Sequence, residues 1–196
     1  MKIKSNEIRN FEKPFFIAEI GINHNGSISI AKKLIDQAKK AGADAVKFQT
    51  FKKDTLNISS IYKDKKADFY FDNKIKSLED IIDRITLSKN DHKILANYCK
   101  KKKILFSSTP LDLEAVDFLD SLNVPFFKVA SMDLNNHVLL EKIATKNKPI
   151  ILSTGFSTIS EISQALKHLR DSNSKIKVAL LHCISSYPPQ DKDLNL

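Results

Sequence analysis

Glycine and cysteine are both scarce in this sequence. Its 196 residues include only four glycines and two cysteines, and 42% of the residues are hydrophobic. The shortage of glycine excludes a collagen-like chain, and the hydrophobic content excludes a disordered one. Cys99 and Cys183 lie far apart and lack the spacing of metal ligands, which argues against a zinc site or a disulfide framework. We therefore expect reduced thiols and a cytoplasmic protein.

Long hydrophobic runs are also missing. The apolar run Phe15–Ala18 is too short for a signal-peptide core or a membrane span, so no membrane association is expected. Lys and Arg number 32 against 23 Asp and Glu, and the net charge of +9 predicts a surface that attracts anions. The basic run Lys100–Lys103 ends a helical pattern without a nucleic-acid recognition motif, so we expect a solvated helix end there and no nucleic-acid partner.

Short β-branched or aromatic runs alternate with stretches of helical period, which is typical of βα units on a parallel sheet. A helical pattern from Ile28 to Ala41, stopped by Gly42, joins the first two strands. Another helix is expected to open with a capping box from Thr158 to Glu161. Six strands are predicted: Phe15–Ile20, Ala45–Thr50, Ile104–Ser108, Phe126–Ala130, Ile150–Thr154 and Val178–Cys183.

Two architectures fit this alternation, an open doubly wound sheet and a (β/α)8 TIM-type barrel. The turn Gly21–Gly26 after the first strand lacks the Gly-x-Gly-x-x-Gly spacing of dinucleotide-binding sheets, which favours the barrel. Six units do not close an eight-stranded barrel, so residues 1–196 are predicted to form the N-terminal part of one. The long polar segment Lys52–Lys76 is expected to be a functional excursion over one end of the sheet.

Polar residues fall at the carboxyl ends of the predicted strands, where barrel enzymes place their active sites. Strand parity directs Lys47 and Gln49 to one face, and Lys128 and Glu19 also lie at strand ends. Burying these charges is costly, so we expect them to bind a phosphate or carboxylate. The alternatives are internal ion pairs, with Glu19 neutralising one lysine, and a Schiff-base role for Lys128.

Hydroxyl groups near these strand ends favour anion binding. Ser131, Ser153 and Thr154 can donate hydrogen bonds to phosphate oxygens, and the turn to Gly155 leads toward a helix N-terminus that could bind an anion.

Two histidines and a tyrosine also lie near strand ends. His24 and His182 are expected to be hydrogen-bonded structural residues, so no metal ligand is assigned. Tyr187 precedes two prolines and either presents its hydroxyl to a ligand or packs on those prolines.

Six segments of the chain resemble, in the same order, motifs of the sialic acid synthase family. The segments are Phe16–Gly26, Ala43–Thr50, Ser107–Pro110, Phe127–Ser131, Ile151–Gly155 and Leu181–Pro188. Each motif alone is weak, whereas the set covers essentially the whole chain and is specific.

The resemblance implies a metal-dependent condensation of phosphoenolpyruvate with an N-acylated amino sugar, giving a nonulosonic acid and phosphate. It implies a divalent Mn or Mg ion and a homodimer in which a C-terminal antifreeze-like domain follows the barrel. By motif, Lys47, Lys128, Ser131 and Ser153 resemble phosphate ligands, and Thr109 resembles an enolpyruvate ligand. Glu19 resembles the carboxylate at the reacting carbons, and Gln49 and Tyr187 resemble sugar contacts.

The sequence departs from the family pattern in two respects. The family's metal-binding histidines lie on motifs beyond the sixth strand, so the metal ligands are expected outside residues 1–196. Ser185 stands where members that use N-acetylmannosamine carry asparagine, which favours a sugar modified elsewhere, as in the legionaminic or pseudaminic acid branches. Two alternatives stay open: a catalytically incompetent anion-binding or interaction module, and a Schiff-base barrel aldolase.

Overall fold

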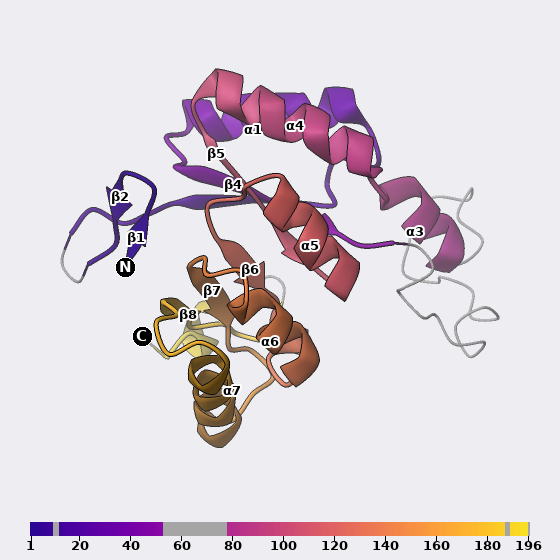
Figure 1. The fold of residues 1–196 in the computed structure, drawn as a ribbon. Helices are drawn as coiled ribbons and strands as arrows, with labels where there is room; N and C mark the ends of the chain where they lie inside the picture. The colour runs from indigo at the N-terminus through magenta and orange to yellow at the C-terminus, as the bar shows by residue number, and fades with distance from the viewer. Residues whose placement is uncertain (10–11, 53–77, 187–188, 196) are drawn as a thin grey trace. The chain divides into compact units, whose positions relative to one another are not determined.

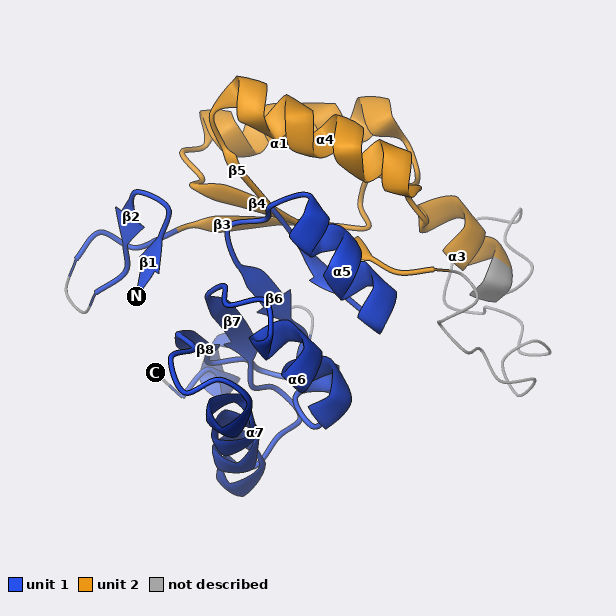
Figure 2. Ribbon diagram, viewed as in Figure 1, with its two compact units in different colours: residues 1–15, 107–196 blue, residues 16–106 orange. Residues whose placement is uncertain are grey.

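The protein is an α/β structure in which helices alternate with the strands of parallel sheets. The computed structural model describes residues 1–9, 12–52, 78–186 and 189–195. The chain divides into two compact units, one of residues 16–106 and one of residues 1–15 and 107–196 (Figure 2). None of the helices in the described ranges combines the length and apolar character needed to cross a membrane.

The unit of residues 16–106 places helices against a parallel sheet. Strands β3, β4 and β5 are hydrogen-bonded in that order, and β5 begins in this unit, where the Leu105 N–H donates to Asp44 O at 3.0 Å. Ser27 caps α1 by accepting a hydrogen bond from the Ile30 N–H. The elements are β3 (Ile17–Gly21), α1 (Ile28–Lys40), β4 (Ala45–Thr50), α3 (Leu78–Ile85), α4 (Lys89–Lys102) and β5 (Leu105–Pro110).

Helices α1 and α4 pack side by side over buried apolar residues (Figure 1). Tyr98 of α4 donates its hydroxyl to Asp36 of α1 at 2.8 Å, and Lys102 forms an ion pair with the same carboxylate at 2.7 Å. Cys99 faces this core, and burial raises the pKa of its thiol to about 12, so the thiol is unreactive. The predicted basic run does form the end of α4, where Lys103 takes a left-handed conformation.

The other unit carries the second parallel sheet, in which β6, β7 and β8 are hydrogen-bonded in that order. Lys128 of β6 is in register with Ile151 of β7, and Ser153 of β7 with Leu181 of β8. The elements are β1 (Lys2–Ile3), β2 (Asn6–Glu7), α5 (Leu113–Ser121), β6 (Phe127–Val129), the 3₁₀ turn η2 (Ser131–Asp133), α6 (His137–Ala144), β7 (Ile150–Ser153), α7 (Ile159–Ser172), β8 (Val178–Leu181) and η3 (Asp191–Asp193).

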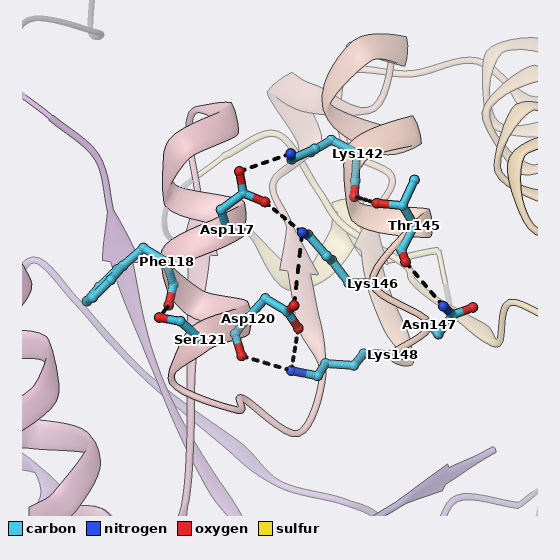
Figure 3. A network of polar contacts seen from close by, with 9 residues as sticks. All are labelled: Asp117, Phe118, Asp120, Ser121, Lys142, Thr145, Lys146, Asn147 and Lys148. Atoms are coloured by element: carbon cyan, nitrogen blue, oxygen red, sulfur yellow. Dashed lines mark hydrogen bonds and ion pairs between the residues drawn. The ribbon is translucent and has the colours of Figure 1, made fainter.

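A network of ion pairs joins α5 to the end of α6 and the segment that follows it (Figure 3). Asp117 accepts from Lys142 at 2.9 Å and from Lys146 at 2.6 Å, and Asp120 accepts from Lys148 at 2.7 Å. The two lysines lower the pKa of Asp117 through hydrogen bonds to its carboxylate. The network fixes the chain immediately before β7, which positions that strand.

All six predicted strands are present, with ends that differ from the predicted ones by up to two residues. The capping box of α7 is also confirmed, because Thr158 and Glu161 bond reciprocally. The sequence prediction missed the antiparallel pair β1 and β2 and the helix α6. The polar excursion predicted from Lys52 to Lys76 lies, apart from Lys52, outside the described residues.

Candidate active site

Glu19 of β3 and Lys47 of β4 form an ion pair. Lys47 Nζ lies 2.9 Å from Glu19 Oε2, and the side chain of Lys47 is only 7% exposed, against 56% for Glu19. The two residues are partners in the parallel register, so neighbouring strands bring them together. This is the arrangement that the ion-pair alternative anticipated for one lysine. A buried ammonium is thus held beside a carboxylate that remains accessible to a ligand.

A β-bulge in β3 follows Glu19, the partner of Lys47. The register advances by one residue on β4 while β3 advances from Glu19 to Gly21, so one residue of β3 is extra. Gly21 has a φ of +54°, and a Cβ there would lie 3.0 Å from Glu19 Oε1 and 3.9 Å from Gln49 Nε2. Glycine therefore leaves space in which Glu19 and Gln49 approach each other. The structure brings the predicted residues Glu19, Lys47 and Gln49 into one cluster.

Two buried histidines, His24 and His92, belong to the same unit as this cluster. His92 Nδ1 donates to Ser88 O at 3.0 Å, while its Nε2 lies 2.9 Å from Thr50 Oγ1 and 3.3 Å from Gln49 O. His24 Nδ1 accepts from the Gly26 N–H at 3.0 Å, which fits the structural role predicted for it. Burial lowers the pKa of both rings, so both are neutral near pH 7. His92 thereby fixes the end of β4, where Gln49 lies.

Replacing His92 by glutamine is expected to lower the free energy of unfolding by about 1–3 kcal/mol at pH 7.5, because buried hydrogen-bonding groups lose a partner. The folded-state pKa of His92 is below its unfolded value of 6.5. The stabilisation that the neutral His92 ring gives to the folded state is therefore complete above pH 6.5 and is lost as the pH falls below that value. Urea denaturation should therefore show that the free energy of unfolding decreases less between pH 7.5 and pH 5 for H92Q than for the wild type.

The matched control for this change is H137Q on the exposed start of α6. Its free energy of unfolding at pH 7.5 should stay within about 0.5 kcal/mol of the wild type, because the substitution is on the surface. Equal pH dependence in H92Q and the wild type would contradict the role assigned to the buried ring.

Lys128 and Ser153 meet at the carboxyl ends of β6 and β7. Lys128 Nζ donates to Ser153 Oγ at 2.6 Å and to Val129 O at 2.9 Å. The hydroxyl of Ser153 accepts from the ammonium and can still donate its own proton. The pair therefore offers a positive charge and a hydroxyl donor in a fixed relation, which suits a phosphate or carboxylate oxygen.

The turn after β7 is held by two hydroxyls from other segments. The Gly155 N–H donates to Ser131 Oγ at 3.0 Å, and the Phe156 N–H donates to Ser185 Oγ at 2.9 Å. A Cβ at Gly155 would lie 2.9 Å from Ser131 Oγ and 3.3 Å from Ser185 Oγ, so only glycine allows both serines to approach. This turn connects the strand of Ser153 to the segments after β6 and β8.

Replacing Gly155 by alanine is expected to displace Ser131 or Ser185 and to weaken the binding of a phosphate or carboxylate ligand at the end of β7 by about tenfold or more. The cost in stability should be smaller, about 1–2 kcal/mol, because the obstructing atoms are side-chain oxygens that can move. Isothermal titration and thermal denaturation of G155A would measure the two effects. S157A, at a hydroxyl that bonds only locally to Gly155 O, is the control and should bind normally. Unchanged affinity in G155A would contradict this account.

The N-terminus of the helix after this turn, α7, is capped by the chain's own side chains. Helix α7 begins at Ile159, four residues beyond Gly155, and its capping box occupies the first turn. Glu161 Oε2 accepts from the Thr158 N–H at 2.7 Å, so the chain supplies its own anion there. This carboxylate would compete with an external anion, and the anion site expected at this terminus stays a prediction.

The remaining predicted residues are placed as follows. Thr109 lies buried on β5, and its role as an enolpyruvate ligand stays a prediction. Tyr187 lies outside the described residues. His182 Nε2 hydrogen-bonds to Leu194 O at 2.7 Å, which agrees with a structural role. The sequence reasoning missed the roles of Gly155 and Ser185 in the turn, although the Ser-Thr-Gly sequence pointed to a tight turn there.

The described residues do not form a cluster of ligands for a divalent metal ion. Within residues 1–9, 12–52, 78–186 and 189–195, no group of three or more His, Cys, Asp or Glu is placed to hold an ion. The family resemblance places the metal ligands beyond the sixth strand, and that expectation stays a prediction.

Comparison with known proteins identifies what the chain is similar to. A model of the NeuB family matches residues 34–196. An uncharacterised protein of Methanocaldococcus jannaschii is 46% identical over 100% of the chain and 53% of its own length. The N,N'-diacetyllegionaminic acid synthase of Campylobacter jejuni is 42% identical over 94% of the chain and 55% of its own length. The chain thus spans about half the length of the curated relatives it matches.

A solved structure shows the same relationship. The N-acetylneuraminic acid synthetase of Leptospira borgpetersenii, in complex with citrate, superposes with a TM-score of 0.76 at 33% identity. The match covers 92% of this chain and 57% of that one. The parallel α/β fold is therefore shared with that protein.

Proposed function

Because the chain belongs to the NeuB family, we propose that it forms the phosphoenolpyruvate-binding part of a nonulosonic acid synthase. The observation that carries this proposal is the Lys128–Ser153 contact, 2.6 Å long at the ends of neighbouring strands. A fixed ammonium with hydroxyl donors suits the phosphate of an enol phosphate. We further propose that residues 1–196 form about six βα units of a TIM-type barrel, with the ligands bound at the carboxyl ends of the strands.

The proposed reaction forms a carbon–carbon bond between C3 of phosphoenolpyruvate and the aldehyde carbon of an N-acylated amino sugar. Water adds to C2 and phosphate leaves, giving a 2-keto acid. Lys47, Lys128, Ser131 and Ser153 are proposed to hold the phosphate end, and Thr109 the enolpyruvate. The fixed positive charges would stabilise the negative charge on the phosphate during the reaction, in place of mobile water molecules.

Glu19 is proposed to accept or relay a proton at the reacting carbons. Its ion pair with Lys47 orients the carboxylate, while its exposure leaves it accessible to substrate. Gln49 and Tyr187 are proposed to contact the sugar.

The intact protein is further proposed to act as a cytoplasmic homodimer with a C-terminal antifreeze-like domain. A divalent Mn or Mg ion would polarise the sugar aldehyde, and its ligands are proposed to lie outside this chain.

The sugar is proposed to be a diacetamido relative of N-acetylmannosamine. Ser185 supports this choice, because its short side chain turns back to bind the Phe156 N–H at 2.9 Å. The name of the Campylobacter jejuni relative, an N,N'-diacetyllegionaminic acid synthase, agrees with such a substrate.

The test is to supply the intact protein with phosphoenolpyruvate and each candidate sugar, and to measure released phosphate and the 2-keto acid. Phosphate release that requires both substrates is expected, with the diacetamido sugar preferred. Absence of release with every sugar, alongside saturable phosphoenolpyruvate binding, would instead favour the anion-binding module. Borohydride trapping with pyruvate should give no adduct at Lys128, because its ammonium donates to two oxygen acceptors. An adduct would identify a Schiff-base aldolase.

A further inference from the structure

A cavity of about 350 Å³ opens at the amino-terminal end of β7 and β8. It is lined by the two segments that lead into these strands, residues 147–149 and 173–177. Ser153 lies at the other end of β7, so the cavity and the proposed phosphate site are at opposite ends of one strand. The volume is within the range of small-molecule sites, which begins at about 300 Å³.

Hydrogen bonds fix the walls of this cavity. Asn173 Nδ2 donates to Asn147 Oδ1 at 2.8 Å and to Ala144 O at 3.0 Å, which ties the two lining segments together. Asn147 Nδ2 donates to Thr145 O at 3.2 Å (Figure 3). The Ile150 N–H donates to Lys177 O at 2.8 Å. The cavity is thus already formed, and a ligand need not order its walls.

The lining carries more positive than negative charge. Lys148, Lys175 and Lys177 all contribute to it. Lys148 is held by Asp120 at 2.7 Å (Figure 3). Lys175 and Lys177 form no ion pair with any carboxylate of the described residues. Both side chains are exposed, so their ammonium groups are available to pair with an anionic ligand.

Apolar surface lies between these cations. Pro149 and Ile176 line the cavity, and neither can satisfy a polar ligand group through its side chain. The combination of these cations with the apolar lining suits an anion with a compact apolar body.

We propose that this cavity binds a small organic oxyanion, a phosphate or carboxylate ester or acid with an apolar body of a few carbon atoms. Lys175 and Lys177 bind the anion, and Pro149 and Ile176 contact the body. The ligand does not compete with substrate, because the proposed substrate residues lie at the carboxyl ends of the strands. The site is therefore suited to a regulatory ligand.

The experiment titrates the purified chain with phenyl phosphate, inorganic phosphate and benzoate, and follows the amide signals of Asn173 and Ile176 by NMR. Phenyl phosphate is expected to saturate these shifts with a Kd about tenfold below that of inorganic phosphate, because the ring covers apolar surface. The comparison of phenyl phosphate with benzoate distinguishes a phosphate ligand from a carboxylate ligand.

Variants separate this site from the proposed active site. Lys175→Ala combined with Lys177→Ala should weaken phenyl phosphate binding at least about tenfold. The matched control, Lys167→Ala with Lys192→Ala, removes two exposed lysines outside the cavity and should change the Kd less than about twofold. Lys128→Ala should leave these amide shifts intact, whatever its effect on phosphoenolpyruvate. Equal weakening in both double variants, or shifts that do not saturate, would overturn the proposal.

Discussion

Replacing Lys128 by alanine in the intact protein is expected, on the proposed function, to lower kcat/KM for phosphoenolpyruvate by about a hundredfold or more. Its ammonium is fixed at the end of β6 by Ser153 Oγ at 2.6 Å and Val129 O at 2.9 Å. In the proposed reaction, a fixed charge would stabilise the departing phosphate more strongly than mobile water does, since no reorganisation is needed. Alanine removes both this charge and the donor to Ser153.

Steady-state kinetics and direct phosphoenolpyruvate binding would measure the effect. Lys142→Ala is the matched control, because Lys142 pairs with Asp117 in the helix network and should be dispensable for catalysis. Its kcat/KM should stay within about twofold of the wild type. Lys128→Arg should remain impaired, since the planar guanidinium cannot occupy the same short contact. Near wild-type kinetics in Lys128→Ala would remove the phosphate assignment.

The strands could be predicted because each is a short apolar run between helical patterns. Ala45–Thr50 matches the predicted bounds, and its alternation placed Lys47 and Gln49 on one face. The residues opposite them, Val46 and Phe48, are fully buried, and Phe48 stacks on Phe106 at 5.5 Å. Period-two alternation therefore carried enough information to group two of the candidate site residues.

Other elements are too short or too irregular for periodicity to reveal. Strands β1 and β2 have two residues each, and α6 has eight. Such lengths give barely one or two repeats of either pattern. The bulge that aims Glu19 depends on an extra residue in β3, which leaves no signature in hydropathy.

Contacts between distant segments were also beyond sequence reasoning. Phe156 and Ser185 are 29 residues apart, yet the serine hydroxyl holds the turn after β7. The capping of α7 by Glu161 is local and was predicted, but its consequence for anion binding was not drawn from the pattern. Residue types indicated where hydroxyls were available, whereas the packed chain determined which backbone groups they bind.

Replacing Gly26 by alanine should be the most destabilising of the substitutions considered, lowering the free energy of unfolding by about 2–4 kcal/mol. Gly26 has a φ of +74°, and an added Cβ would collide with the backbone oxygen of Arg84 at the end of α3. A backbone atom cannot move aside as a side chain can, so either the turn or the helix must shift. Thermal denaturation should show a decrease in Tm of about 5–15 °C.

Gly42→Ala isolates the steric part of this effect. Gly42 also has a positive φ, +88°, but a Cβ there would meet nothing within 4 Å. Its substitution should cost only the conformational penalty of a left-handed residue, about 1–2 kcal/mol. The difference between the two variants therefore measures the collision with Arg84. Equal decreases in Tm would show that the turn at Gly26 relaxes freely, and would contradict the close packing of that turn against α3.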